Sequence, residues 1–221
     1  MIWIDQVVNI CRKQVQIIAE LDKKQAIIQA ALEEFYHKGY EGASTNQITK
    51  SAGVSKGILF HYFSDKRSLY LTLVDECMSH YFHTLASSLP DLSEDLFEAL
   101  DQLSKIKIDA FKREPMKYGF ITKTFMTMSN ELKTELHLKQ QRMKEHAVDL
   151  LVSRVDHNRF RTDIEPKQAI EFVLLSLEAL IAKQINSLNE TELDEGGAAP
   201  TLDMGLYLHM LKYGVYREAG K

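Results

Sequence analysis

The sequence is poor in residues that break helices and in cysteine. Ten glycines and four prolines in 221 residues make about 6% of the chain, against the ~12% that is usual. Two cysteines, Cys11 and Cys77, are too few for a disulfide framework, so we expect two thiols in a reducing compartment. These scarcities argue against a β-sandwich or an α/β enzyme and favour long helices.

The chain also lacks the marks of a membrane protein, a secreted protein or an enzyme. No apolar run approaches the ~18 residues of a membrane-spanning helix, and Asp5 and Arg12 would interrupt the apolar core of a signal peptide. We therefore expect a cytoplasmic protein with no membrane partner. The sequence has no phosphate loop, H-E-x-x-H, G-x-S-x-G or paired-cysteine motif, so we expect no catalytic residues, no metal and no cofactor.

Helical periodicity runs through almost the whole chain, and breakers divide it into segments. The first segment carries one apolar stripe, formed by Ile4, Val7, Val8, Cys11, Val15 and Ile18. Asp22 is expected to cap a second helix that ends at Gly39. The other predicted helices are 45–52, 55–62, 66–87, 93–114, 115–129, 130–155, 165–189 and 201–218, with a linker at 190–200.

Residues 39–57 hold four of the ten glycines, and the helices between them are only eight or nine residues long. Short helices joined by a glycine turn are typical of a helix-turn-helix motif. Gly53 is expected to take the left-handed conformation of the turn, and Ser55 to cap the second helix of the motif. We therefore expect an all-α protein whose N-terminal three-helix unit binds DNA.

The formal charge of −4 gives no excess of positive charge for a polyanion, but the charge is unevenly distributed. Residues 1–67 hold nine basic and seven acidic side chains, whereas residues 68–221 hold 18 basic and 24 acidic ones. Within 44–67 the balance is +3, interleaved with Phe60, His61 and Tyr62. Such a basic, aromatic and hydrogen-bonding surface suits DNA phosphates and base edges.

A recognition helix enters the major groove with its N-terminus first. The first-turn side chains Lys56, Ile58 and Leu59 and the Gly57 backbone are therefore expected near the DNA, although Leu59 is also expected to lock the helix onto its neighbours. Thr45 and Ser55 can donate to phosphates, and Lys66 can hold the flanking backbone. The complete set of predicted DNA-binding residues is Ser44, Thr45, Ser55, Lys56, Gly57, Phe60, His61, Tyr62 and Lys66.

A resemblance to the tetracycline-repressor (TetR) family rests on Ser44 to Leu69, which read S-T-N-Q-I-T-K-S-A-G-V-S-K-G-I-L-F-H-Y-F-S-D-K-R-S-L. Ala30 to Tyr40, A-A-L-E-E-F-Y-H-K-G-Y, is similar to the first helix of that family. The resemblance implies a DNA-binding domain over 22–70, with its motif at 44–63, and a helical effector-binding and dimerisation domain over 71–221.

Two positions depart from the family pattern. Phe60 stands where the family usually has tyrosine, so a phosphate-contacting hydroxyl is missing and His61 and Tyr62 are expected to compensate. Arg67 replaces a usually acidic residue, and its charge is expected to strengthen contact with the DNA backbone. Residues 1–21 exceed the usual length before the first helix. They form an N-terminal extension that can be an added helix, an arm near the DNA or residues before the natural start.

The resemblance implies a homodimer that binds a palindromic operator and is released by a small-molecule effector, most simply as a repressor. Apolar residues occupy more than one face of 165–189, so one face needs a partner. The predicted dimer residues are Phe172, Leu175, Ala179, Leu206, Met210 and Tyr213. A pocket for a largely apolar effector is expected at Met116, Phe120, Thr122, Phe125, Met126 and Glu178.

Other interpretations compete with each of these predictions. The rival function is a helical protein–protein interaction module without specific DNA binding, because a three-helix unit need not bind DNA. Stripes of methionine and aromatic residues are more often plain core than pocket. For the stripe at 4–18, packing on its own protein is favoured over a membrane surface, because Arg12 and Lys13 make only a thin basic face.

Overall fold

The computed structural model describes residues 2–185 and 204–216, with side chains described for 20–182 and 205–216. This part of the chain is helical apart from connecting loops and one isolated β-bridge between Phe160 and Tyr216, which confirms the predicted all-α class. The predicted linker at 190–200 lies outside the described residues. The elements are α1 (Ile2–Gly42), α2 (Thr45–Ala52), α3 (Lys56–Tyr62), α4 (Lys66–Ser88), η1 (Leu89–Asp91), α5 (Leu96–Arg113), α6 (Pro115–Met126), α7 (Lys133–Arg154), η2 (His157–Arg159), α8 (Pro166–Ile185) and α10 (Met204–Val215).

Helix α1 corrects the prediction that Asp22 starts a second helix. The helix runs from Ile2 through Asp22 without a break, and its only non-helical backbone is at Gly39 (φ 66°, ψ −179°). The Asp22 side chain is exposed, so it is solvated and tolerated within a helix, and neither glycine nor proline stands nearby to end the helix. Only the predicted break at Gly39 is present, because a glycine reaches a positive φ without steric cost.

The chain forms two compact units, of which the first comprises Met1–Ser87 and Lys107–Gln140. Its centre is a group of aromatic rings in edge-to-face contact: the Tyr70 ring meets Phe35 at 4.8 Å, Tyr40 at 5.1 Å and Phe120 at 5.3 Å between centroids. The Tyr70 hydroxyl shares a 2.8 Å hydrogen bond with Thr124, so this buried polar atom is satisfied. Burial raises the pKa of Tyr70.

Helix α6 packs directly on α1 within this unit. A Cβ added to Gly119 would lie 2.6 Å from Cε2 of Tyr36, so only glycine allows the two helices to approach this closely. The Lys123 ammonium lies 4.6 Å from the centroid of the same tyrosine ring. A small cavity of about 150 Å³ opens beside this contact, lined in part by Tyr36, Tyr70 and Phe120.

The second compact unit comprises Ser88–Ile106 and Gln141–Lys221, and a carboxylate lies at its centre. Asp95 is only 2% exposed. Its Oδ1 accepts hydrogen bonds from the backbone N–H groups of Phe97 (2.9 Å) and Glu98 (3.2 Å). Asp95, and not Ser93, therefore caps the helix that follows, which moves its start from the predicted Ser93 to Leu96.

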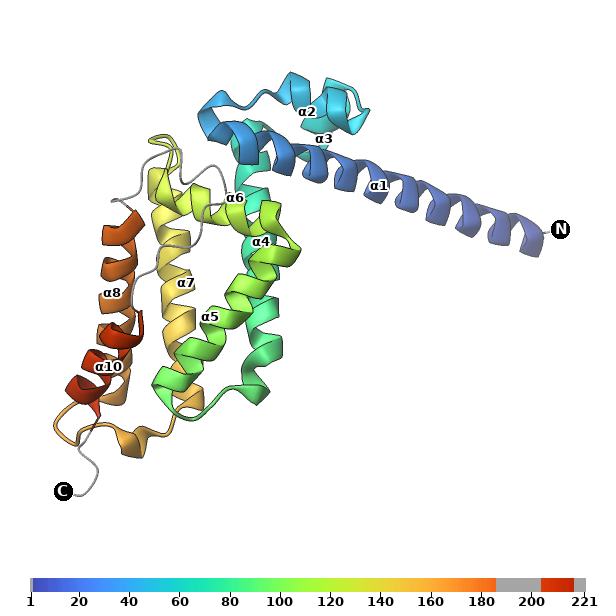
Figure 1. The fold of residues 1–221 in the computed structure, drawn as a ribbon. Coiled ribbons are helices and arrows are strands. Elements are labelled where there is room, and N and C mark those ends of the chain that lie inside the picture. The colour runs from blue at the N-terminus through green and yellow to red at the C-terminus, as the bar shows by residue number, and fades with distance from the viewer. Residues whose placement is uncertain (1, 186–203, 217–221) are drawn as a thin grey trace. The chain divides into compact units, whose positions relative to one another are not determined.

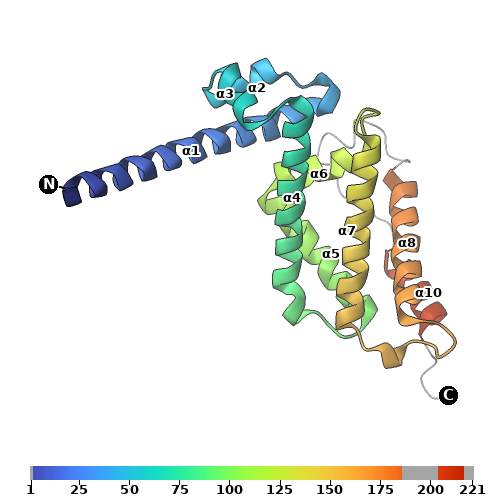
Figure 2. The same cartoon turned by 180° about the vertical axis from the view of Figure 1, so that it is seen from behind.

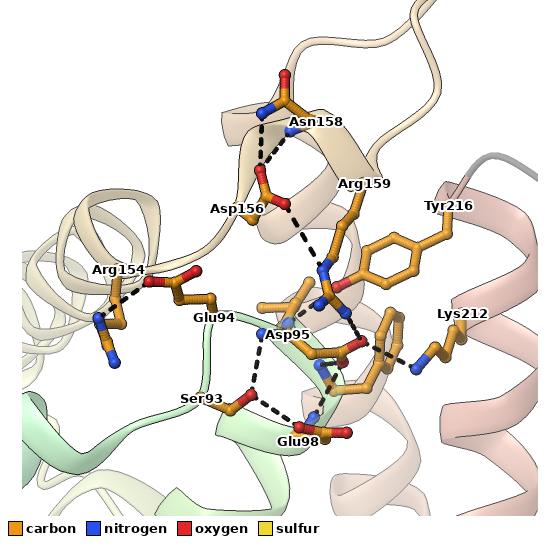
Figure 3. Close-up of polar contacts among 12 residues, drawn as sticks. Ser93, Glu94, Asp95, Glu98, Arg154, Asp156, Asn158, Arg159, Lys212 and Tyr216 are labelled. Atoms are coloured by element: carbon orange, nitrogen blue, oxygen red, sulfur yellow. Dashed lines mark hydrogen bonds and ion pairs between the residues drawn. The ribbon is translucent and has the colours of Figure 1, made fainter. Parts of the chain in front are cut away.

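The other oxygen of Asp95 binds two cations from distant parts of the chain. Arg159 Nη1 lies 2.7 Å and Lys212 Nζ 3.0 Å from Oδ2, and Figure 3 shows both side chains converging on the carboxylate. Burial alone would raise the pKa of Asp95, but the hydrogen bonds from Lys212 and the two backbone amides outweigh it, so the pKa is lowered. The Tyr216 hydroxyl accepts the Leu96 N–H at 2.8 Å, which further ties α10 to the start of α5.

The two compact units do not follow the predicted limits at residues 21 and 70, because α4 stays with the first unit as far as Ser87. The division into an N-terminal extension, a DNA-binding domain and an effector domain therefore remains a prediction about function.

Cys77 is a buried free thiol, and burial raises its pKa to about 12. The side chain of Cys11 lies outside the described residues.

Candidate nucleic-acid interface

The helix-turn-helix motif forms as its local sequence predicts. Helix α2 ends at Gly53, which adopts the left-handed conformation (φ 65°, ψ 29°) and donates its N–H to the Lys50 carbonyl at 3.3 Å. Ser55 then caps α3, because its hydroxyl accepts the Ile58 N–H at 3.3 Å. Figures 1 and 2 show α2 and α3 beside the C-terminal part of α1, with the N-terminal part of α1 continuing beyond them.

Buried apolar side chains fix the face that the motif presents. Ile48, Leu59 and Phe63 point into the core, so the opposite side of α3 is turned to solvent. The expectation that Leu59 also lies beside the DNA is wrong, because its side chain is fully buried. Five of the predicted DNA-binding residues are exposed on or next to α3: Ser55, Lys56, Gly57, Phe60 and His61. The Lys56 ammonium makes no ion pair among the described residues, and its position in the first turn of α3 is the one that a recognition helix offers to DNA.

A buried glutamate holds the start of the motif. Oε1 of Glu34, on α1, accepts the Ser44 N–H at 3.0 Å and lies 3.1 Å from Lys38 Nζ. The Ser44 hydroxyl makes no capping bond, and the Glu34 carboxylate binds the start of α2 in its place. Ser44 and Thr45 are both half-buried at this end of α2.

Two predicted residues are already engaged within the protein. The Tyr62 hydroxyl donates to the Glu20 carbonyl at 3.0 Å, which joins the end of α3 to α1. Lys66 Nζ donates to the Glu41 carbonyl at 3.1 Å and lies 4.8 Å from the centroid of the Tyr40 ring. Both residues therefore position the motif, and the Lys66 charge remains close to its surface.

The expectation for Arg67 changes more. Its guanidinium forms an ion pair with Glu135 of α7, so the positive charge that distinguishes this chain is neutralised internally. The guanidinium N–H groups that were expected to bind the DNA backbone donate instead to the Glu135 carboxylate. The sequence could not reveal this partner, because it lies 68 residues away.

The six residues predicted for an effector pocket have different surroundings. Phe120 is buried in the aromatic centre and lines the 150 Å³ cavity, and Met116 and Phe125 are half-buried. Thr122 and Met126 are exposed. Glu178, on α8, forms an ion pair with Lys144 at 2.7 Å.

All six residues predicted for the dimer interface are exposed in the single chain. Phe172, Leu175 and Ala179 lie on α8, and Leu206, Met210 and Tyr213 lie on α10. Apart from Ala179, each of these side chains is between 55% and 70% exposed. Such exposure is unusual for large apolar side chains on helices that also carry buried residues. Val173 and Val215, on the same two helices, are buried.

The described residues hold neither a membrane-spanning helix nor a metal-binding cluster. No helix there combines the length and apolar character that crossing a bilayer requires. In the same ranges, no three His, Cys, Asp or Glu side chains gather as they would around a metal ion.

Comparison with known proteins places this geometry in context. Residues 27–73 match the family described as "Bacterial regulatory proteins, tetR family". Over 191 residues the chain is 26% identical to the HTH-type transcriptional repressor AcnR of Corynebacterium efficiens, covering 83% of this chain and 90% of that protein.

Two solved structures share the fold. The fatty acid degradation regulator FadR from Bacillus halodurans superposes with a TM-score of 0.63 at 19% identity, over 88% of this chain and all of the other. The transcriptional regulator FadR from Bacillus subtilis, solved in complex with stearoyl-CoA, gives 0.62 at 16% identity, over 87% of this chain and all of the other.

Proposed function

The chain belongs to the TetR family of bacterial regulatory proteins, and from this premise we propose that it is a homodimeric repressor released from its operator by a small, largely apolar effector. The observation that carries the proposal is helix α3. Ser55 caps it, Leu59 anchors it in the core, and Lys56 is exposed in its first turn. The proposed activity is regulation of transcription in the cytoplasm, and not catalysis.

The first turn of α3 enters the major groove. Lys56 donates to a guanine or to a phosphate, and Gly57 lets the backbone approach closely. The exposed ring of Phe60 suits a thymine methyl group, which takes the place of a tyrosine–phosphate contact. Ser44, Thr45 and Ser55 donate to phosphates around the helix ends, with His61 and Lys66 at the flanks. Tyr62 contributes by fixing the end of α3 to α1.

Two copies bring two recognition helices to a palindrome with half-sites about one helical turn apart. The exposed apolar residues of α8 and α10 supply the two-fold contact, since burying them removes apolar area from water. They are Phe172, Leu175, Ala179, Leu206, Met210 and Tyr213.

The effector contacts residues of α6, and its chemistry is largely apolar. Two observations support this class: the methionine and aromatic residues of α6, and the acyl-CoA bound by the Bacillus subtilis protein of the same fold. Because α6 packs on α1 through Gly119 and Tyr36, a shift of α6 is felt by the helix that holds the motif. A differential affinity of ~1–3 kcal/mol between two states gives a ~5- to 150-fold change in operator affinity.

The test of DNA binding compares two lysines by fluorescence anisotropy on a duplex from the chain's own upstream region. Lys56→Ala is expected to weaken binding by about tenfold or more and to reduce the salt dependence, because it removes a groove contact. Lys105→Ala is the matched control: it removes the same charge from an exposed site on α5. Equal affinities for the two variants, or no salt dependence, would reject the DNA interface and favour the interaction module.

The effector half is tested separately by measuring operator affinity with and without long-chain acyl compounds. Weaker binding with an acyl compound, and not with a polar compound of the same charge, supports the proposal. Unchanged operator affinity across acyl compounds of different chain lengths would remove the effector class while leaving the DNA interface intact.

A further inference from the structure

The cavity of about 150 Å³ in the first compact unit is lined by residues of α1, α4 and α6. Its buried walls are the rings of Phe35, Tyr40, Tyr70 and Phe120. Figures 1 and 2 show α6 beside the C-terminal part of α1, which supplies two of these rings. A cavity of roughly 150 Å³ can hold one benzene-sized ring. The space therefore suits a small flat molecule and is too small for a long acyl chain.

The rim of this cavity is exposed and carries a cation. It is formed by His37, Gly39, Lys123 and Thr127. The Lys123 ammonium lies 4.6 Å from the centroid of the Tyr36 ring, and none of the described lining residues is acidic. A Cβ added to Gly39 would meet no atom within 4 Å, so there is open space at this edge. A ligand that enters here meets a positive charge at the mouth and aromatic rings beneath it.

A hydrogen-bond donor is left over in the buried wall. The hydroxyls of Tyr70 and Thr124 share one hydrogen bond of 2.8 Å, and the two residues are only 5% and 3% exposed. Each hydroxyl carries one proton, so the bond gives each oxygen a partner but uses only one of the two protons. Thr122 and Thr127 each donate to the carbonyl four residues earlier, whereas Thr124 makes no such bond among the described residues. A buried donor without an acceptor is costly, and an oxygen atom of a ligand in the cavity is a suitable acceptor.

These features together specify a class of ligand. The size of the cavity and its ring walls select an aromatic ring, the remaining hydroxyl proton selects an oxygen acceptor, and Lys123 selects a negative charge. The donor pair is buried and the lysine is at the rim, so the acceptor and the charge belong at opposite ends of the ring. We propose that this cavity binds a small monocyclic aromatic acid that carries a ring hydroxyl, with its carboxylate at Lys123 and its hydroxyl oxygen at the Tyr70–Thr124 pair.

This site is separate from the one proposed for the acyl effector. Phe120 is the only residue that the described lining shares with the predicted effector pocket. Tyr36 and Tyr40 belong to α1, which carries the motif, and Phe120 and Lys123 belong to α6, so the bound acid contacts both helices. Because the acid binds the folded unit, it should also raise the temperature at which that unit unfolds.

Isothermal titration calorimetry of the full chain with para-hydroxybenzoate tests the class of ligand. Saturable binding is expected, with a dissociation constant on the order of 10 µM to 1 mM. Benzoate lacks the hydroxyl and para-hydroxybenzyl alcohol lacks the charge, so each should bind about tenfold more weakly. Absence of saturable binding, or equal binding of the three compounds, would overturn the proposal.

A pair of double variants tests the buried donors. Tyr70→Phe with Thr124→Val removes both hydroxyls and keeps the shape of the wall, so the fold should be retained. The preference for para-hydroxybenzoate over benzoate should then disappear. Tyr118→Phe with Thr84→Val is the matched control, because it removes another tyrosine–threonine contact between α6 and α4, at 3.1 Å, and should keep the preference. The same preference in both double variants would place the acid elsewhere and overturn the site.

Two lysine variants test the charge at the rim. Lys123→Met should remove the preference for para-hydroxybenzoate over the alcohol, whereas Lys112→Met, which removes a charge from an exposed site on α5, should keep it. Thr127→Trp gives a further measure if the double variant at Tyr70 and Thr124 loses its far-ultraviolet helical signal. It narrows the exposed mouth and should weaken binding by about tenfold or more. Unchanged binding in the Lys123 or the Thr127 variant would contradict the site.

The outcomes for this site and for the proposed function are distinguishable, because calorimetry needs neither operator DNA nor an acyl compound. A chain that binds its operator and responds to acyl compounds but does not bind para-hydroxybenzoate contradicts only this inference. A chain that binds the acid with the expected preferences but has no affinity for an operator supports the site and contradicts only the proposed function.

Discussion

The two compact units of this protein are organised around opposite kinds of centre. In the first, the rings of Phe35, Tyr70 and Phe120 meet edge to face, and the polar atom among them is satisfied by Thr124. In the second, the buried Asp95 carboxylate binds Arg159, Lys212 and the first turn of α5. The first centre is built from apolar rings, whereas in the second a buried ionic cluster adds to an apolar core that includes Leu96, Leu151 and Ile170.

The difference predicts how each unit responds to change. Apolar burial is roughly proportional to area and indifferent to ionisation, so the first unit should depend on ring size and fit. A buried carboxylate depends on its partners, because the desolvation penalty stays when they are removed. The second unit should therefore be sensitive to protonation and to loss of a single side chain.

The largest expected effect is at the aromatic centre. Phe35→Ala should lower the free energy of unfolding by about 3–5 kcal/mol, because it removes buried area and leaves a cavity. Phe111→Ala is the control, since Phe111 is 46% exposed and should cost less than about 1 kcal/mol. Urea denaturation followed by circular dichroism, at one fixed chain concentration, measures both. Equal losses would show that the aromatic rings add nothing beyond ordinary surface.

Asp95 is the corresponding position of the second unit. Asp95→Asn keeps an oxygen to cap α5 but weakens the bonds to Arg159 and Lys212, so the expected loss is about 2–3 kcal/mol. The loss is smaller than for Phe35 because both cations are partly exposed and regain water. Asp101→Asn removes an exposed pair on the same helix and should change stability by less than about 0.5 kcal/mol. The same denaturation experiment decides between them.

The two centres should also differ in how their contribution to stability depends on pH. Because the folded pKa of Asp95 is lowered, its contribution is present above the unfolded pKa of ~3.9 and is lost as pH falls through the folded pKa. The stability gap between wild type and Asp95→Asn should stay constant from about pH 8 to about pH 5 and shrink below about pH 4. The gap for Phe35→Ala should not change over the same range. A gap at Asp95 that persists in acid would contradict a role for its charge.

The parts predicted correctly from the sequence depend on near neighbours. Gly53 and Ser55 set the turn and the cap within a few residues, so their types and spacing determine the motif. The continuity of α1 was missed because Asp22 is a good capping residue but equally a solvated one inside a helix. Helix ends depend on such competing local options.

The parts that escaped prediction depend on partners far away in the sequence. Asp95 followed by Glu98 is a local capping pattern, yet its partners Arg159 and Lys212 are 64 and 117 residues away. In the candidate interface, the positions of Lys56 and Phe60 followed from the motif. The pairing of Arg67 with Glu135 did not, because residue type alone does not identify a partner.

The smallest expected effect concerns the fit of α6 on α1. Gly119→Ala should cost about 1–2 kcal/mol, because the new Cβ would lie 2.6 Å from the Tyr36 ring and the helices must separate or the ring must move. Gly214→Ala is the matched control: Gly214 also lies in a helix but has no atom within 4 Å of the added Cβ. That change should be neutral or stabilise by up to about 1 kcal/mol, because alanine favours the helix. Thermal denaturation measures both changes in stability. Opposite signs of the two changes would show that the close approach of the helices, and not helix propensity, requires glycine at position 119. The same sign for both would show that helix propensity dominates and that the Tyr36 ring moves at little cost.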